Sequence, residues 1–285
     1  MIANFIDGLV KYEFLQNALI TCIIVGLISG VIGSFIVLRG MSLMGDAISH
    51  AVLPGVAISY MVGANFIIGA SVFGLMAAGL IGFVTQKSKL KNDTAIGIVF
   101  SSFFALGIIL ISFAKSSTDL YHILFGNVLA VRQSDIVITA SVALVVFIFV
   151  IIFYKELLVS SFDPTMAQAY GLNVQLIHYG LMFGLTLVAV TSLQTVGTVL
   201  VVALLVTPAA TAFLLTNKLS VMIVISALLS TLSSVIGLFF SYNYNLASGA
   251  AIVLTAAGFF IIAFIFSPKQ GIVFKKKERK LNETT

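Results

Sequence analysis

The sequence predicts an all-α protein, a polytopic bundle of transmembrane helices that forms a single domain over residues 1–285. Two observations carry this prediction. Of the residues, 60% are hydrophobic and only 9% are charged, whereas soluble domains carry roughly 25% charged residues. Apolar runs of about 20 residues, the length of a helix that crosses a bilayer, recur from end to end. We therefore expect a multi-pass membrane protein without a separate soluble domain.

Eight or nine membrane spans are expected. Two gaps between apolar runs, at 62–65 and 193–195, are short, so neighbouring runs are hard to separate. A short amphipathic segment, 1–16, precedes the first run, and a basic tail, 268–285, follows the last. The nine apolar runs lie near residues 17–38, 46–62, 65–86, 94–114, 135–154, 176–193, 195–216, 220–241 and 246–267.

The basic residues indicate the topology, because cytoplasmic loops of membrane proteins are enriched in Lys and Arg. The tail carries KKKERK, which predicts a cytoplasmic C-terminus. The opposite side holds only Lys11, Lys115 and Arg132, so nine spans and an external N-terminus are favoured. Because the net charge of +5 comes from these clusters, no nucleic-acid partner is expected. Counting back from the tail, alternate loops carry Lys218, Lys155, Lys91, Lys89, Lys87 and Arg39.

Small residues predict where helices approach each other closely in the membrane. The first run has three glycines at three- or four-residue spacing, and the third run has four. Packing within one chain is favoured over a dedicated dimer interface. The glycines of the two runs are Gly26, Gly30 and Gly33, and then Gly69, Gly74, Gly79 and Gly82.

An acid and an imidazole interrupt the apolar pattern in the segment MGDAISHAVLPG, residues 44–55. Asp46 and His50 are four residues apart and share one face of a helix. Ionisable side chains within a membrane are costly, and they usually face a partner or an aqueous path. Pro54 lacks the N–H that would bond the carbonyl of His50, so this carbonyl is expected to be free.

These three groups favour a divalent metal ion. Oxygen and nitrogen ligands without sulfur suit Mn²⁺, Fe²⁺ or Zn²⁺ better than Cu⁺. The one cysteine, Cys22, lies in an apolar run, so a thiolate cluster within one chain is excluded. The ligands are too few for a closed site, and a second chain, another helix or water would have to complete it. One alternative stays open, in which Asp46 only caps a helix and His50 is a satisfied polar group near the interface.

A second motif, SFDPTMAQAYGLNV at residues 161–174, predicts a short helix between two apolar runs. Asp163 suits the N-cap, Pro164 the first helical position and Gly171 the C-terminal end. Because a helix of about two turns does not persist alone in water, it must dock on the membrane domain or on a cytoplasmic partner. The chain has no G-x-x-x-x-G-K-[ST] phosphate loop. It is therefore not expected to be an enzyme, and any ATPase is another polypeptide.

The sequence resembles the membrane permeases of bacterial manganese, zinc and iron ABC importers over essentially its whole length. It is most similar to the manganese-type members of Gram-positive bacteria. Four blocks carry the resemblance in the same order: VLRGMSLMGDAISHAVLPGVA (37–57), KNDTAIGIVFSSFFALGI (91–108), STDLYHILFGNVLAV (117–131) and GTVLVVALLVTPAATAFLL (197–215).

The resemblance implies a homodimer in the bacterial cytoplasmic membrane, of the type related to cobalamin importers. It implies two cytoplasmic ATPase subunits and an extracellular metal-binding lipoprotein that delivers the ion. The cargo would be a divalent metal ion, with Mn²⁺ favoured and Zn²⁺ or Fe²⁺ open, and no intrinsic cofactor is expected. The capped segment 163–171, which includes Gln168, falls where the coupling helix of the family lies.

The resemblance also implies roles for residues of the second run. Asp46 and His50 match the metal-coordinating positions of the family in the translocation path. Leu53, Val56 and Tyr60 follow at helical spacing and would line the outer closure of that path. A lipid-facing or core position for these three residues is an equally open alternative.

Two other functions compete with an ABC permease. A secondary transporter or channel would need further intramembrane acids for a proton or sodium relay, and only Asp46 is well placed. An intramembrane metalloenzyme could use Asp46 and His50 to hold a metal. However, the chain has neither H-E-x-x-H nor a nucleophile–base pair.

Overall fold

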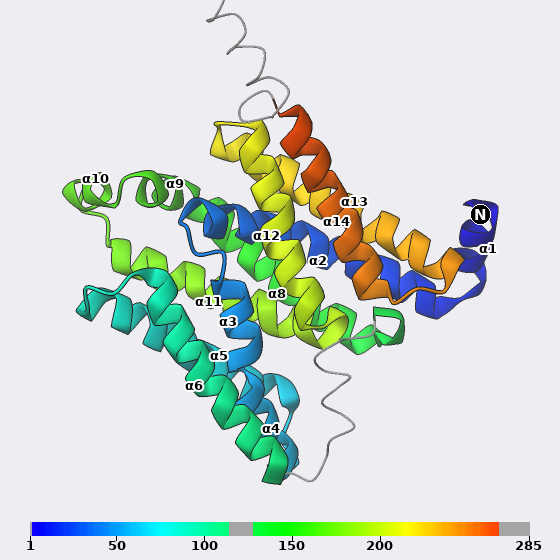
Figure 1. The fold of residues 1–285 in the computed structure, drawn as a ribbon, viewed down its shortest axis with the longest axis horizontal. Coiled ribbons are helices and arrows are strands. Elements are labelled where there is room, and N and C mark those ends of the chain that lie inside the picture. Colours follow the sequence, from blue (N-terminus) through cyan, green and yellow to red (C-terminus); the bar gives the residue numbers. More distant parts are fainter. Residues whose placement is uncertain (1, 114–127, 268–285) are drawn as a thin grey trace, which may run out of the picture.

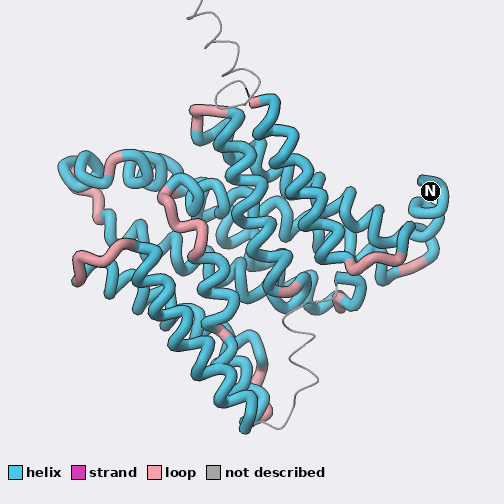
Figure 2. Tube along the Cα trace, viewed as in Figure 1, coloured by secondary structure: helices cyan, strands magenta, loops and turns pink. Residues whose placement is uncertain are grey.

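The computed structural model describes residues 2–113 and 128–267, and their regular structure is entirely helical. The basic tail 268–285, expected to be cytoplasmic, lies outside the described residues. Figure 1 shows the arrangement, and Figure 2 shows the short connections between helices. The helices are α1 Ile2–Lys11, α2 Glu13–Leu38, α3 Met44–Ala51, α4 Leu53–Val62, α5 Phe66–Lys87, α6 Asn92–Phe113, the 3₁₀ turn η1 Val128–Ala130, α8 Gln133–Ile152, α9 Tyr154–Phe162, α10 Pro164–Ala169, α11 Val174–Val196, α12 Thr198–Leu215, α13 Leu219–Tyr244 and α14 Ser248–Phe266.

Eight of the described helices are long and apolar enough to cross a membrane: α2, α5, α6, α8, α11, α12, α13 and α14. They correspond to eight of the nine predicted runs. The expectation of one continuous helix over the remaining run, 46–62, is wrong, because the chain forms α3 and α4 with a break at Val52. Pro54 explains this break, since it lacks an N–H and occupies the first turn of α4, where none is required.

The long helix α2 is the most buried of the eight and packs against α8, α12 and α13. Its glycines make these contacts possible. A Cβ on Gly30 would lie 2.5 Å from the Cα of Ala227 in α13, and one on Gly33 would lie 1.9 Å from the backbone oxygen of Leu205 in α12. Both glycines therefore pack against helices of the same chain, as the sequence favoured.

A second group of helices, α3 to α6, lies beside this core (Figure 1). Within it, α4 packs on both α5 and α6, while α3 also contacts α11 and α12. The helices α4 and α5 approach each other closely at two glycines. A Cβ on Gly69 would lie 2.2 Å from the carbonyl oxygen of Gly55. The segment that carries Asp46 and His50 is thus held between the two groups of helices.

One end of the bundle gathers several of the loops that carry the basic residues. Arg39, directly after α2, donates hydrogen bonds to Ser160 and Ser161 of α9. A pocket of about 240 Å³ at this end joins Leu38, Phe162 of α9 and Lys218 before α13. Figure 1 places the α5–α6 connection at the same left-hand end as α10. These loops therefore lie at one end of the described bundle, and their side of the membrane stays a prediction from the charges.

Candidate functional site

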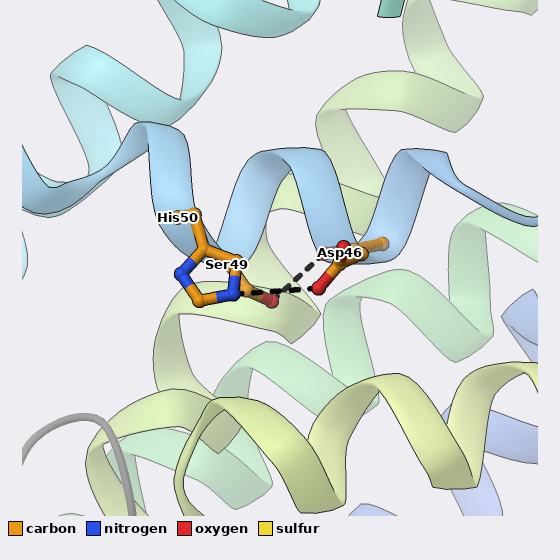
Figure 3. A network of polar contacts seen from close by, with 4 residues as sticks. Asp46, Ser49 and His50 are labelled. Atoms are coloured by element: carbon orange, nitrogen blue, oxygen red, sulfur yellow. Dashed lines mark hydrogen bonds and ion pairs between the residues drawn. The ribbon is translucent and has the colours of Figure 1, made fainter. Parts of the chain in front are cut away.

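Asp46 and His50 extend from the same face of α3 (Figure 3). The His50 Nε2 atom lies 3.4 Å from the Asp46 Oδ1 atom. The Asp46 side chain is 45% exposed and that of His50 is 23% exposed, so a carboxylate and an imidazole are accessible together. The neighbouring Ser49 is buried, and its hydroxyl donates to the Gly45 carbonyl at 2.8 Å. The accessible polar atoms on this face are therefore one carboxylate and one imidazole.

The structure decides against Asp46 as a simple helix cap. The N-cap of α3 is Leu43, without a side-chain hydrogen bond, and Asp46 lies inside the first turn. The expectation of a free His50 carbonyl is wrong, because a backbone N–H at the C-cap of α3 donates to it. The helix is interrupted at Val52, before Pro54. The tighter turn at this point gives the His50 carbonyl a hydrogen-bond donor that a continuous helix would not have provided.

A single chain supplies an incomplete set of metal ligands. Over the described ranges, no three or more His, Cys, Asp or Glu side chains come together in a way that could hold a metal ion. Cys22 is buried in α2, away from α3 in the sequence and outside any such group. His178 is on α11 beside Tyr179, and His122 lies outside the described residues. The Asp46–His50 pair is therefore the candidate site, and it needs partners from elsewhere.

The wall behind His50 comes from α6, which sequence reasoning did not connect with the site. The rings of Phe100 and Phe104 both make T-shaped contacts with the imidazole. Since about 50 residues separate the two segments in sequence, only the packing of α3 on α6 brings them together. The sequence offers one indication of this contact, namely that the four-residue spacing of the two phenylalanines places them on one helix face.

The three candidate gate residues do not share one environment. Leu53 and Val56 are buried in the core of this chain, whereas Tyr60 is 55% exposed. Leu53 packs closely on Gly107 of α6, where an added Cβ would lie 2.7 Å from the Leu53 Cβ. In this single chain, Leu53 and Val56 therefore occupy core positions, as one of the alternatives allowed, whereas Tyr60 presents its ring at the surface.

The helix predicted from its caps is present as α10. The Asp163 carboxylate accepts a hydrogen bond from the Met166 N–H at 2.9 Å, and Pro164 begins the helix. The Thr165 hydroxyl and the Met166 N–H both donate to Asp163, and they hold the pKa of this carboxyl below its usual value. Asp163 therefore remains an ionised cap at neutral pH.

Gly171 ends the helix as predicted, with a left-handed φ of 80°. Its N–H donates to the Gln168 carbonyl at 2.9 Å, and the Leu172 N–H donates to the Ala167 carbonyl at 3.1 Å. This pair of bonds is the Schellman motif. Ala167 is buried while Gln168 is exposed, so α10 rests on the bundle by one face and presents the other.

Three large apolar side chains are exposed along α9 and α10. Phe162, Met166 and Tyr170 follow at intervals of four residues, and each is at least half exposed. Exposed apolar side chains that gather in this way are typical of a surface that contacts a protein or a membrane.

Arg39 ties this helical pair to the segment that leads into α3. Its Nε donates to the Ser161 hydroxyl at 2.9 Å and its NH2 group to the Ser160 hydroxyl at 2.8 Å. Burial lowers the pKa of the guanidinium to about 10, so it remains charged at neutral pH. The sequence alone predicts only that Arg39 lies in a cytoplasmic loop, because its serine partners are some 120 residues away in the chain.

Comparison with known proteins settles the family. The sequence pattern of the ABC 3 transport family matches residues 11–267. The chain belongs to the ABC 3 transport family. It is 70% identical over 273 residues to the manganese transport system membrane protein MntC of Listeria monocytogenes, which covers 96% of this chain and 98% of that protein.

Solved structures support the same fold for this ABC 3 chain. One chain of PsaBC from Streptococcus pneumoniae, solved in complex with Fab, has a TM-score of 0.86 and 59% identity, covering 95% of this chain and 98% of that one. A metal-chelate type ABC transporter in an inward-facing conformation has a TM-score of 0.71 at 15% identity, over 90% and 87% of the two chains, which shows the fold alone.

Membership of the ABC 3 family confirms the resemblance inferred from the four sequence blocks. The predicted fold class, a multi-pass helical bundle of an ABC permease, is confirmed as well. The secondary transporter and the intramembrane metalloenzyme are set aside, because an ABC 3 chain is a membrane component of an ABC transport system.

Proposed function

We propose that this chain is the permease of an ABC importer that carries Mn²⁺ into a bacterial cell. The observation that carries the proposal is the Asp46–His50 pair. It is accessible on α3 in a chain of the ABC 3 family, and its two side chains lie 3.4 Å apart. A relative with 70% identity is named a manganese transport protein.

The chemistry of the pair supports a transported ion rather than a resident one. A carboxylate and an imidazole without sulfur suit Mn²⁺, with Zn²⁺ and Fe²⁺ as competing cargo. Two ligands from one chain bind a first-row ion weakly, because such ions take about four to six ligands. An ion held this way can be released to the next part of the path.

A separate ATPase drives this transport, because the chain has no phosphate loop. We assign α10, from its cap Asp163 and Pro164 through Gln168 to Gly171, as the coupling helix. The exposed apolar side chains of Phe162 at the end of α9, Met166 in α10 and Tyr170 at its C-cap provide the surface on which a cytoplasmic ATPase subunit docks. Two such subunits act on two permease chains, with the C-terminus on their side of the membrane.

The permease acts as a homodimer with the ion path between the two copies. A second chain related by a two-fold axis doubles the number of Asp46–His50 ligands, and this symmetry is the commonest one among oligomers. An extracellular metal-binding lipoprotein delivers the ion to the outer mouth. Among the candidate gate residues, Tyr60 is exposed on α4 and is assigned to the outer closure, whereas Leu53 and Val56 are buried within the chain.

Competitive metal uptake tests the function. Cells that lack this chain are compared with cells that carry the whole system, using radioactive Mn²⁺ at limiting concentration with Zn²⁺ or Fe²⁺ as competitor. We expect uptake to depend on the chain and Mn²⁺ to be taken up in preference to the other ions. Uptake that is equal with and without the chain would overturn the proposal, and a preference for Zn²⁺ would overturn the assignment of manganese.

A further inference from the structure

The two ring nitrogens of His50 lie in opposite environments. The Nε2 atom faces the Asp46 carboxylate at 3.4 Å, on the accessible side of α3. The Nδ1 atom is buried and has no hydrogen-bond partner in the described part of the chain. A buried polar atom without a partner is unusual in a protein and needs an explanation.

Two aromatic rings of α6 lie against the imidazole of His50. The ring centroids of His50 and Phe100 are 5.6 Å apart at an angle of 67°, and those of His50 and Phe104 are 5.4 Å apart at 83°. Phe100 and Phe104 are one helical turn apart and stack on each other, with centroids 5.7 Å apart. The imidazole therefore stands nearly perpendicular to a continuous aromatic wall.

The position of this wall is fixed by close packing on either side of it. One turn beyond Phe104, an added Cβ on Gly107 would lie 2.7 Å from the Leu53 Cβ and 3.2 Å from the Pro54 Cδ. On another side of α6, Phe103 packs edge-on against Phe73 of α5 at 6.2 Å. Because α6 is held against both α4 and α5, the wall cannot easily withdraw from His50.

We propose that Phe100 and Phe104 are positioning residues that make Nε2 of His50 the metal-binding nitrogen and place the Nδ1–H against aromatic rings. This inference rests on the proposed function of the Asp46–His50 pair. If the imidazole turned over, its Nδ1 side would face the path and its Nε2 would be enclosed by the wall. The aromatic wall thus selects both the orientation and the tautomer of the ligand.

The aromatic wall has a consequence for transport. A metal-binding histidine usually donates its second N–H to a carboxylate or carbonyl, which makes the ring a stronger ligand. An N–H group that faces an aromatic ring makes a weaker interaction. His50 is therefore a precisely oriented but weak ligand, which favours release of the ion to the next part of the path.

Two substitutions of Phe104 that should shift the KM for Mn²⁺ in opposite directions test this inference by uptake kinetics. Phe104→Leu keeps an apolar residue but removes the ring, so His50 gains freedom and the KM for Mn²⁺ should rise about tenfold. Phe104→Gln offers an amide oxygen to Nδ1–H, so KM should fall and the maximal rate should fall with it. Phe104→Tyr keeps the ring and should leave KM unchanged. The matched control is Phe113→Leu, an exposed phenylalanine at the end of the same helix, away from the wall.

The outcomes separate this inference from the proposed function. A raised KM in Phe104→Leu together with a lowered KM in Phe104→Gln supports it, whereas a merely structural role would shift both variants in the same direction. Unchanged KM in both variants, or shifts equal to that of Phe113→Leu, would overturn it. Where Phe104→Gln does not assemble, Phe100→Gln replaces it. His50→Ala is measured in parallel. Near-normal uptake by that variant overturns the proposed role of the pair itself, while loss of uptake leaves the comparison at Phe104 decisive.

Discussion

At the scale of single residues, Gly69 limits how closely α4 and α5 can approach each other. A Cβ at this position would lie 2.1 Å from the Ser59 hydroxyl oxygen, against the backbone of Gly55. We expect Gly69→Ala to destabilise the permease by about 1–3 kcal/mol through overpacking. Thermal unfolding of the purified protein in detergent measures this effect.

Gly79, on the same helix, provides the matched control. Nothing lies within 4 Å of a Cβ added there. Because alanine is a better helix former than glycine by about 1 kcal/mol, Gly79→Ala should be neutral or slightly stabilising. Equal midpoints of unfolding for the two variants would show that the Gly55–Gly69 contact does not limit the packing of α4 on α5.

How much of the site could be predicted depended on whether its determinants were local. Asp46 and His50 were found because helical spacing and the cost of ionisable groups in lipid are properties of the sequence itself. Phe100 and Phe104 were not found, because their contact with His50 arises only when α3 packs on α6. The His50 carbonyl was wrongly predicted to be free, because the effect of Pro54 on the preceding turn depends on where the helix breaks.

At the scale of elements, α10 should face the cytoplasm and an ATPase subunit. A cysteine replacing the exposed Gln168 should react with thiol reagents from the cytoplasmic side and crosslink to a cysteine on the ATPase surface. Ala167→Cys is the control, because Ala167 is fully buried and should not react. The native Cys22 is buried and should not interfere. If residue 168 is inaccessible from the cytoplasm, the topology and the coupling role are both wrong.

Arg39 should link this coupling element to the segment before α3. Arg39→Met removes the hydrogen bonds to Ser160 and Ser161 but keeps an apolar stem. Since a hydrogen bond to a charged group contributes about 1.5–3 kcal/mol, we expect a lower midpoint of thermal unfolding and reduced Mn²⁺ uptake. Lys218→Met removes an exposed charge at the same end and should have little effect.

A double-mutant cycle checks whether Arg39 acts through the two serines. Replacing both Ser160 and Ser161 by alanine should reduce stability in the same direction as Arg39→Met, and the combined variant should lose less than the sum. Additive losses would mean that Arg39 stabilises the end of α2 by another route.

The elements themselves were largely predictable, since length and hydropathy identify a membrane helix and the cap residues identify α10. The break between α3 and α4 was not predicted. Pro54 is compatible with a kink in a continuous helix as well as with the start of a new helix. The structure has a new helix, α4, and its first residues, Leu53 and Pro54, pack on Gly107 of α6.

At the scale of the whole molecule, a shared ion path predicts that one defective chain impairs its partner. When His50→Ala chains are coexpressed with wild type, mixed dimers should form and take up Mn²⁺ poorly, because each ion needs ligands from both copies. Purified mixed dimers, isolated with two different affinity tags and placed in liposomes with the ATPase, allow this measurement. Mixed dimers that transport at least about half as fast as wild type, with unchanged metal affinity, would mean that each chain has its own path.

The Asp46 carboxylate should be a ligand for the transported ion, and Mn²⁺ uptake by the Asp46→Asn variant measures this directly. The neutral amide nearly preserves the shape of the side chain but removes the anionic ligand, so folding and ATPase assembly should persist. Asp93→Asn, at the exposed start of α6, is the matched control and should transport normally. Uptake by Asp46→Asn should be abolished, and uptake near the wild-type rate would mean that the carboxylate is not a ligand for the ion.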